Sequence, residues 1–217
     1  MKLVKQIFLF VCCVLFFACS PAQKSEGSSS GNKFNDCPPE GSANSPRIAV
    51  LNENKNRNIF PGTADIDATI TLKKILEPGN DKDRWKVSQG VRITGYVYDV
   101  KPGGVETCNC KEKEIDGRDT HIELVIDPMD NAKTKRVIVE VTPRIREIMK
   151  QKGEDWSTKK LRDKLLGRWV CFEGWLLFDE EHANQAENTN PGRERNWRAT
   201  TWEVHPVTGI KVVNKPK

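Results

Sequence analysis

The sequence predicts a mainly β protein, built around a five-stranded barrel with a helical insert between strands 3 and 4. Five segments in the second half of the chain are rich in β-branched and aromatic residues. Two of them carry an interior glycine, Gly95 and Gly174, at which a strand of a small barrel can bend sharply. Between the third and fourth segments the apolar spacing changes from about two residues to about 3.6, which indicates helix.

The strands are expected, in chain order, at residues 91–100, 120–127, 136–141, 169–178 and 197–204. The second alternates cleanly, with apolar side chains on one face and His121 and Glu123 on the other. Pro128 ends it. The fifth is expected to bend at Pro206 and to continue over residues 210–213.

The helical insert is expected between residues 143 and 167. Pro143 can open a first helix that ends before Gly153. Ser157 or Thr158 can cap a second helix, which Gly167 closes. Both segments have apolar residues three and four positions apart, as expected for helices that pack one face on a core.

This order of elements, from residue 91 to residue 213, resembles the OB-fold, a Greek-key barrel with a helix between strands three and four. The resemblance implies ligand binding on the face of strands two and three, between the loops that join strands one to two and four to five. A β-sandwich is the structural alternative, and it needs no helix at that place. Residues 64–79 are expected to add a strand or to cover one end of the barrel.

The N-terminal segment has the pattern of a secretory signal. Lys2 and Lys5 precede an apolar run that ends at Ala18, and Cys19 follows. The pattern resembles the signal of a bacterial lipoprotein, which is cut before the cysteine so that this residue becomes the acylated N-terminus. The resemblance implies a signal peptide over residues 1–18 and lipid attachment at Cys19. Secretion without a lipid, after cleavage at Ala18, is the alternative.

The same signal bears on where the protein resides. The apolar run has about a dozen residues, whereas a helix needs roughly 20 to cross a bilayer. Ser20 rather than Asp follows Cys19, and in the enterobacterial sorting rule that this resembles, the protein goes to the outer membrane of a Gram-negative bacterium. Residues 19–45 have little apolar content and are expected to form a lipidated, disordered tether. Residues 46–217 then form the barrel domain with an N-terminal extension.

Charge limits the choice of partners. The formal net charge is +5, and removing the two signal lysines leaves 5 − 2 = +3. This is modest for a nucleic-acid-binding domain, in which clustered positive charge is expected. We therefore expect the membrane, through the lipid, and a ligand or partner of the cell envelope, rather than nucleic acid.

Four cysteines besides Cys19 remain after signal removal. In an oxidising compartment, Cys37 can pair with Cys108 or with Cys110, and both pairings remain open. Bonding between Cys108 and Cys110 is geometrically harder, since one residue separates them. Cys171 lies within an apolar strand pattern and is expected in the core.

Two long polar connections, residues 101–119 and 179–196, are expected to flank the binding surface. An oligosaccharide, a peptide or a partner protein would fit it. Alternatively, residues before 91 cover the two tyrosines, or the connections have no role in a purely structural envelope lipoprotein. With the adjoining strand faces, the connections supply the predicted ligand-binding residues: Tyr96, Tyr98, Arg118, His121, Glu123, His182, Asn188, Arg193, Glu203 and His205.

Catalysis has weaker support in the sequence. Residues 116–120 read DGRDT, similar to the Asp-Gly-Asp-Thr run of staphylococcal thermonucleases, which are OB-fold enzymes. The inserted residue moves the second acid to the opposite side of an extended segment, so no catalytic residue is transferred. An extracytoplasmic hydrolase of phosphodiesterase type is kept as the alternative to a binding module.

Metal binding is not indicated by the spacing of ligands. Only one residue separates Cys108 from Cys110, which is closer than the paired ligands of a structural zinc site usually stand. No two histidines stand three or four residues apart. A metal would have to use His121, His182 or His205 as nitrogen donors. We therefore predict no catalytic residue, no metal and no other cofactor.

Overall fold

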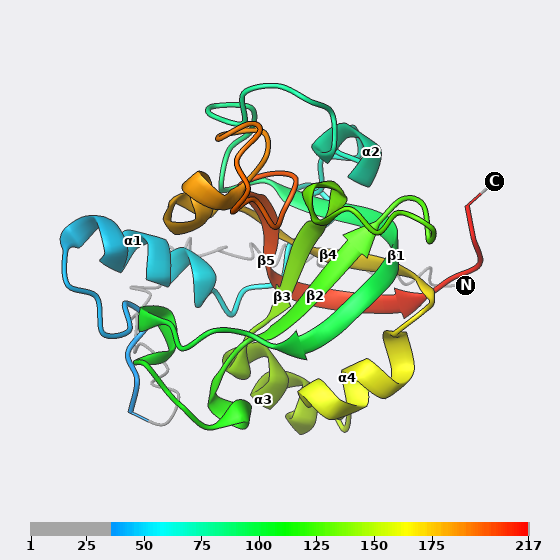
Figure 1. Cartoon of the computed structure of the whole chain (residues 1–217). Coiled ribbons are helices and arrows are strands. Elements are labelled where there is room, and N and C mark those ends of the chain that lie inside the picture. Colours follow the sequence, from blue (N-terminus) through cyan, green and yellow to red (C-terminus); the bar gives the residue numbers. More distant parts are fainter. Residues whose placement is uncertain (1–35, 217) are drawn as a thin grey trace, which may run out of the picture. The chain divides into compact units, whose positions relative to one another are not determined.

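The computed structural model describes residues 36–216, so the predicted signal peptide, Cys19 and most of the predicted tether lie outside the described residues. Five strands close into a barrel in the order β1-β2-β3-β5-β4 (Figure 1). Neighbours are antiparallel except β3 and β5, which are parallel. The predicted OB-fold order is thereby confirmed, and closure excludes the β-sandwich. The strands are β1 (Gly90–Pro102), β2 (Thr120–Val125), β3 (Val137–Val141), β4 (Trp169–Phe178) and β5 (Trp202–Val212).

The helical insert lies between β3 and β4, as predicted, and forms α3 (Pro143–Gln151) and α4 (Thr158–Leu165). Thr142 caps α3 by accepting a hydrogen bond from the backbone N–H of Ile145, and Pro143 takes the first turn, where its missing N–H is not needed. In the part of the chain that the structure describes, no helix is long and apolar enough to cross a membrane.

The remaining helical segments are short. Two α-helices precede the barrel, α1 (Pro46–Lys55) and α2 (Leu72–Ile75). The 3-10 turns are η1 (Thr107–Asn109), η2 (Ile115–Gly117), η3 (Lys133–Lys135) and η4 (Glu180–Gln185). Of these, η1 and η2 belong to the connection between β1 and β2, and η4 belongs to the connection between β4 and β5.

The core fills the barrel with side chains from all five strands and from the helical insert. Ile70, Leu72 and Ile75 also belong to it. A Cβ atom on Gly95 would lie 2.6 Å from Leu72 Cδ2, so this glycine lets α2 pack closely on β1. Residues 64–79 thus cover the barrel rather than extend its sheet, apart from a single bridge between Ile66 and Gly90.

Two strand predictions differ from the structure. The last strand was expected over residues 197–204 with a bend at Pro206, whereas β5 runs without interruption from Trp202 to Val212. Cys171 was expected in the core but is half-buried. Its neighbours Val170 and Phe172 are fully buried, so alternation along β4 directs Cys171 to the outer face.

The folded part of the chain begins earlier than the predicted boundary at residue 46. Cys37 forms a disulfide with Cys110, which resolves the pairing that the sequence left open. Asn52 and Asn56 donate hydrogen bonds of 2.8 Å to the carbonyl oxygens of Glu40 and Pro39. The end of the predicted tether, residues 36–45, is therefore held against the domain.

Candidate functional site between the two long connections

The two long connections meet at one end of the barrel, as the resemblance to the OB-fold implies. Lys55 Nζ lies 2.8 Å from Glu106 Oε2 in the first connection and 2.8 Å from Asp179 Oδ2 at the start of the second. Lys55 is the last residue of α1, and Figure 1 shows this helix between η1 and η4. The chain therefore covers the surface between its two long connections with a helix that the sequence analysis did not predict.

α1 is fixed there by apolar and polar contacts. Ile48 and Leu51 pack against Leu177 of β4. Asn52 donates a hydrogen bond of 3.1 Å to the hydroxyl of Thr107 in η1. These contacts bury the inner face of the helix and leave the groups beneath it out of contact with solvent.

Beneath α1 lies a buried network of ionisable side chains centred on His205. The His205 ring is fully buried, and its Nδ1 atom lies 3.0 Å from Glu203 Oε1 and 3.3 Å from Glu140 Oε2. Arg198 in turn lies 2.8 Å from Glu203 Oε2. Because β3 and β5 are parallel neighbours, the carboxylate of Glu140 is brought next to the ring.

The network continues onto the face of β2. His121 Nδ1 lies 2.8 Å from Glu140 Oε1. Glu123 is paired with Arg136 at 2.5 Å and with Lys101. Each buried carboxylate here has at least one cationic or hydrogen-bonding partner, as the cost of burying a charge requires.

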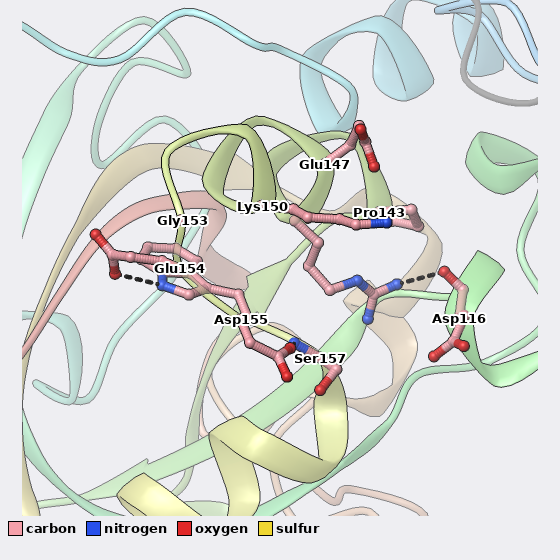
Figure 2. A pocket seen from close by; sticks show the side chains of 10 residues that line it. Asp116, Pro143, Glu147, Lys150, Gly153, Glu154, Asp155 and Ser157 are labelled. Atoms are coloured by element: carbon pink, nitrogen blue, oxygen red, sulfur yellow. Dashed lines mark hydrogen bonds between the residues drawn. The ribbon is translucent and has the colours of Figure 1, made fainter.

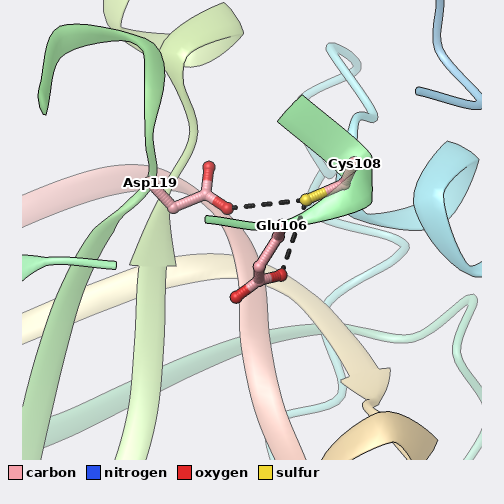
Figure 3. Close-up of side chains that lie close together, drawn as sticks. All are labelled: Glu106, Cys108 and Asp119. Carbon is pink, nitrogen blue, oxygen red and sulfur yellow. Dashed lines mark hydrogen bonds between the residues drawn. The ribbon is translucent and has the colours of Figure 1, made fainter. Parts of the chain in front are cut away.

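A third part of the network joins Asp119 to the first connection (Figure 3). Cys108 Sγ lies 3.6 Å from Glu106 Oε2 and 3.8 Å from Asp119 Oδ2. On its other side, Asp119 Oδ2 lies 3.8 Å from His205 Nε2. Asp119 is thus the residue shared by the connection and the strand network.

The electrostatics of the network follow from its burial. Burial raises the pKa of Asp119 to about 7, against the attraction of His205. Burial opposes the ionisation of Glu106 as well, but Lys55 lowers the pKa of this carboxyl to about 2. Burial would also lower the pKa of His205, yet the surrounding carboxylates raise it to about 9, with Glu203 the strongest of them. The neighbouring carboxylates therefore favour a positive charge on or beside this ring.

Four of the ten predicted ligand-binding residues belong to this network: His121, Glu123, Glu203 and His205. They were expected on an open face. Trp197 covers that face instead, with its ring 5.5 Å from the His121 ring and Nε1 donating a 2.6 Å hydrogen bond to Gln185. The face of β2 and β3 is therefore closed by the chain's own second connection.

The two predicted tyrosines lie away from the connections. Tyr96 packs edge-on against Trp169, at 5.9 Å between ring centroids. Tyr98 donates a 3.0 Å hydrogen bond to Asn131, and the Arg136 guanidinium lies 4.1 Å above its ring. Both rings thus have partners within the domain. These partners all follow residue 91, whereas the alternative expected residues before 91 to cover the tyrosines.

The remaining predicted residues belong to the connections. Arg118 contributes its carbonyl oxygen, which accepts a hydrogen bond from Arg146. His182 is half-buried against Trp197. Asn188 donates to Asp81 Oδ1 at 3.1 Å. Arg193 is exposed and lines a hollow of about 490 Å³ in the second connection.

The sequence analysis missed several members of the buried network. Their common signal is a charged residue where an apolar one is expected, as with Glu140 within an otherwise apolar strand. No local pattern identifies Lys55, since the residues that bury it come from distant parts of the chain. The members missed are Lys55, Glu106, Glu140, Asp179 and Arg198, whereas Cys108 and Asp119 were considered but not assigned to a site.

A separate pocket of about 550 Å³ lies between α3, the α3–α4 connection and η2 (Figure 2). Trp156 and Pro143 contribute its apolar surface, and its polar rim is mainly acidic. Asp116, the first acid of the nuclease-like run, lines this pocket and is separated from Asp119. The two acids therefore do not form one site.

No known family model matches the chain, and no curated protein matches it.

Proposed function

We propose that the protein is a lipid-anchored extracytoplasmic binding module, attached through Cys19 to the outer membrane of a Gram-negative bacterium. The lipoprotein-like signal supports this location. We assign the recognition surface to the second long connection, because Trp197 covers the β2–β3 face and α1 covers the surface between the two connections.

The observation that carries this proposal is the hollow in that connection. Residues 186–201 contain no helix or strand, yet together with the end of η4 they form an open hollow of about 490 Å³ that is lined by polar residues alone. These are Asn184, Gln185, Asn190, Arg193, Glu194 and Arg195. Long connections with a fixed shape are more often functional than decorative.

Internal hydrogen bonds give this connection its fixed shape. Asn196 donates to Glu187 Oε2 at 2.7 Å and to the carbonyl oxygen of Asn190 at 2.8 Å. Thr189 donates to the carbonyl oxygen of Ala183 at 2.7 Å. Asp81, which is fully buried, accepts a 2.8 Å hydrogen bond from the backbone N–H of Thr201. A connection held at both ends in this way loses little entropy when it binds.

The lining indicates the chemistry of the ligand. Side-chain amides donate and accept hydrogen bonds, which suits hydroxyl groups, and Arg193 and Arg195 are exposed guanidinium groups that can bind a carboxylate or phosphate. An acidic oligosaccharide fits this combination best. A peptide with a carboxylate and an envelope protein fit less completely, because no apolar residue lines the hollow.

An array of acidic and neutral oligosaccharides, with acidic peptides beside them, tests the proposal. We expect binding of acidic glycans that the double variant Arg193→Ala/Arg195→Ala weakens by at least about tenfold, the loss of a charge-assisted contact. Arg92→Ala is the matched control, because Arg92 is an exposed arginine on β1 paired with Glu173. Equal binding by the double variant and the wild type would refute the assignment of this surface.

A hydrolase is the second candidate, and the proximity of Asp119 to His205 favours it. The arrangement of His205 against Glu203 is that of a base held by an orienting carboxylate. Both reacting groups are buried, however, so a substrate would reach them only if α1 moved. Turnover of a phosphodiester by the wild type, lost in Asp119→Asn, would favour the hydrolase over the binding module.

A further inference from the structure

The part of the buried network around Asp119 has the composition of a metal site. Its carboxylate, the carboxylate of Glu140 and the ring of His205 each offer a ligand atom, and the three atoms lie within 4.8 Å of one another. Cys108 and Glu106 form a second such group with Asp119. The donors come from the first connection, β3 and β5, so only the folded barrel brings them together.

One nitrogen points into this group without a partner. His205 Nε2 is buried, and among residues 36–216 it has no hydrogen-bond partner. Its nearest charged neighbour is Asp119 Oδ2, at 3.8 Å. Buried polar atoms in folded proteins nearly always have a partner, so this nitrogen is available to a bound ion.

The other ring nitrogen is already held as a metal-binding histidine requires. Nδ1 of His205 lies 3.0 Å from Glu203 Oε1, and Arg198 fixes that glutamate. Metal-ligating histidines usually donate their second ring N–H to a carboxylate in this way, which orients the ring and leaves the first nitrogen for the metal. His205 therefore presents Nε2 toward Asp119.

The balance of charge also calls for a cation. Five buried or half-buried carboxylates in the described part of the chain form ion pairs in this network. Two of their partners, Lys55 and Arg198, carry a permanent positive charge. Burying carboxylates is costly without positive charge beside them, and a divalent ion that displaces the proton from His205 Nε2 would supply that charge. The carboxylates are those of Glu106, Asp119, Glu140, Asp179 and Glu203.

The donor set selects the class of ion. A thiol, an imidazole and carboxylates together suit Zn²⁺ and related transition metals, whereas Mg²⁺ and Ca²⁺ prefer oxygen alone. In a tetrahedral zinc site, bonds of about 2.0 to 2.3 Å place the ligand atoms about 3.3 to 3.8 Å apart. The distances from Asp119 Oδ2 to Cys108 Sγ and to His205 Nε2 are both 3.8 Å, at the upper end of that range.

We propose that this end of the barrel binds one divalent transition-metal ion of the Zn²⁺ class through His205 Nε2 and the Asp119 carboxylate, with Cys108 and Glu140 as the neighbouring donors. Glu106, whose side chain is 22% exposed, marks the edge from which the ion enters. The site is independent of the ligand surface proposed on the second connection, so either proposal can fail without the other.

Metal uptake by the full chain tests the proposal directly. The purified protein is treated with a chelator, without reductant so that the Cys37–Cys110 disulfide stays intact, and then reloaded with Zn²⁺ or Co²⁺. We expect one Zn²⁺ per chain by elemental analysis and a higher melting temperature on reloading, since the ion binds the folded state alone. With Co²⁺ we expect the intense visible bands of a four-coordinate site. No stoichiometric uptake, or preference for Ca²⁺ over Zn²⁺, would overturn the proposal.

Variants place the ion within the structure. Asp119→Asn and His205→Gln should each weaken Zn²⁺ binding by more than about 100-fold, because loss of a ligand exceeds the effect of losing an outer partner. His182→Gln and Cys171→Ser are the matched controls, and both should bind as the wild type does. Wild-type affinity in folded Asp119→Asn, or loss of binding in His182→Gln, would overturn the assignment.

Cys108→Ser tests the site with a substitution that leaves the buried charged side chains in place. If Cys108 is a ligand, the Co²⁺ protein shows a thiolate-to-metal charge-transfer band that this variant lacks while Cys171→Ser retains it. Absence of that band in the wild-type Co²⁺ protein would remove Cys108 from the site. Circular dichroism of each metal-free variant separates loss of binding from loss of the fold.

Discussion

Lys55 and Asp179 form an ion pair of 2.8 Å in which both side chains are almost fully buried, at 1% and 2% exposure. The same ammonium group lies 2.8 Å from Glu106. Burial disfavours the charged form of Lys55, but the attraction of Asp179 and Glu106 prevails and raises its pKa well above the ordinary value. This one side chain therefore connects α1 with both long connections of the barrel.

Lys55→Met is expected to destabilise the protein by about 3 to 5 kcal/mol, because it leaves buried carboxylates without their cation. The free energy of unfolding, measured by urea denaturation, checks the prediction. Lys159→Met is the control, since Lys159 forms an exposed ion pair with Asp163 and its loss should cost less than about 1 kcal/mol. A similar effect of the two substitutions would contradict a structural role for the buried ion pair.

The Cys37–Cys110 disulfide holds the segment before α1 to the first connection. It joins residues 73 positions apart, and restricting a loop of that length in the unfolded chain stabilises the fold by about 4 kcal/mol. We expect the double variant Cys37→Ser/Cys110→Ser to lose most of this amount in urea denaturation. Cys171→Ser, which removes an unpaired thiol on the outer face of β4, should change little. An unchanged midpoint in the double variant would show that other contacts hold the segment.

Gly174 packs closely against the backbone of β5. A Cβ atom there would be 2.3 Å from the carbonyl oxygen of Pro206 and 3.0 Å from the Cα atom of Val207, both in the backbone. Gly174→Ala should therefore cost at least about 2 kcal/mol, as overpacking of a core does. At Gly62 the nearest atom to such a Cβ is Asp65 Oδ2, at 3.5 Å, so Gly62→Ala should be nearly neutral. Thermal unfolding of the two variants is the measurement. Equal losses of stability would indicate a general effect of replacing glycine rather than this specific contact.

Much of the barrel could be predicted because its signals are local. The strand expected over residues 169–178 matches β4 at both ends, since a mostly apolar and aromatic run is bounded there by Gly167 and Asp179. Proline and a capping residue likewise placed the start of α3. Alternation also put His121 and Glu123 correctly on the face opposite the barrel core.

What covers that face could not be predicted in the same way. Trp197 reaches His121 from 76 positions further along the chain, and Lys55 reaches Asp179 from 124 positions before it. No periodicity in either segment encodes such a contact. The sequence analysis missed α1, although Ser45 and Pro46 are ordinary signals for the start of a helix. The helix has few apolar residues, and one of them, Val50, is exposed, so their spacing does not mark a buried face. The predicted open surface was therefore a face that the chain fills with its own side chains.

The lipid anchor is tested at Cys19, which lies outside the described residues. If the signal is that of a lipoprotein, Cys19→Ala removes the atom that carries the lipid, and the protein should leave the membrane fraction and lack incorporated palmitate. Cys12→Ala is the matched control, because Cys12 lies within the apolar run and should remain dispensable for acylation. Fractionation and metabolic labelling of both variants provide the measurement. Retention of Cys19→Ala on the membrane with lipid still attached would exclude this anchor, whereas release of the wild type without lipid would favour plain secretion after Ala18.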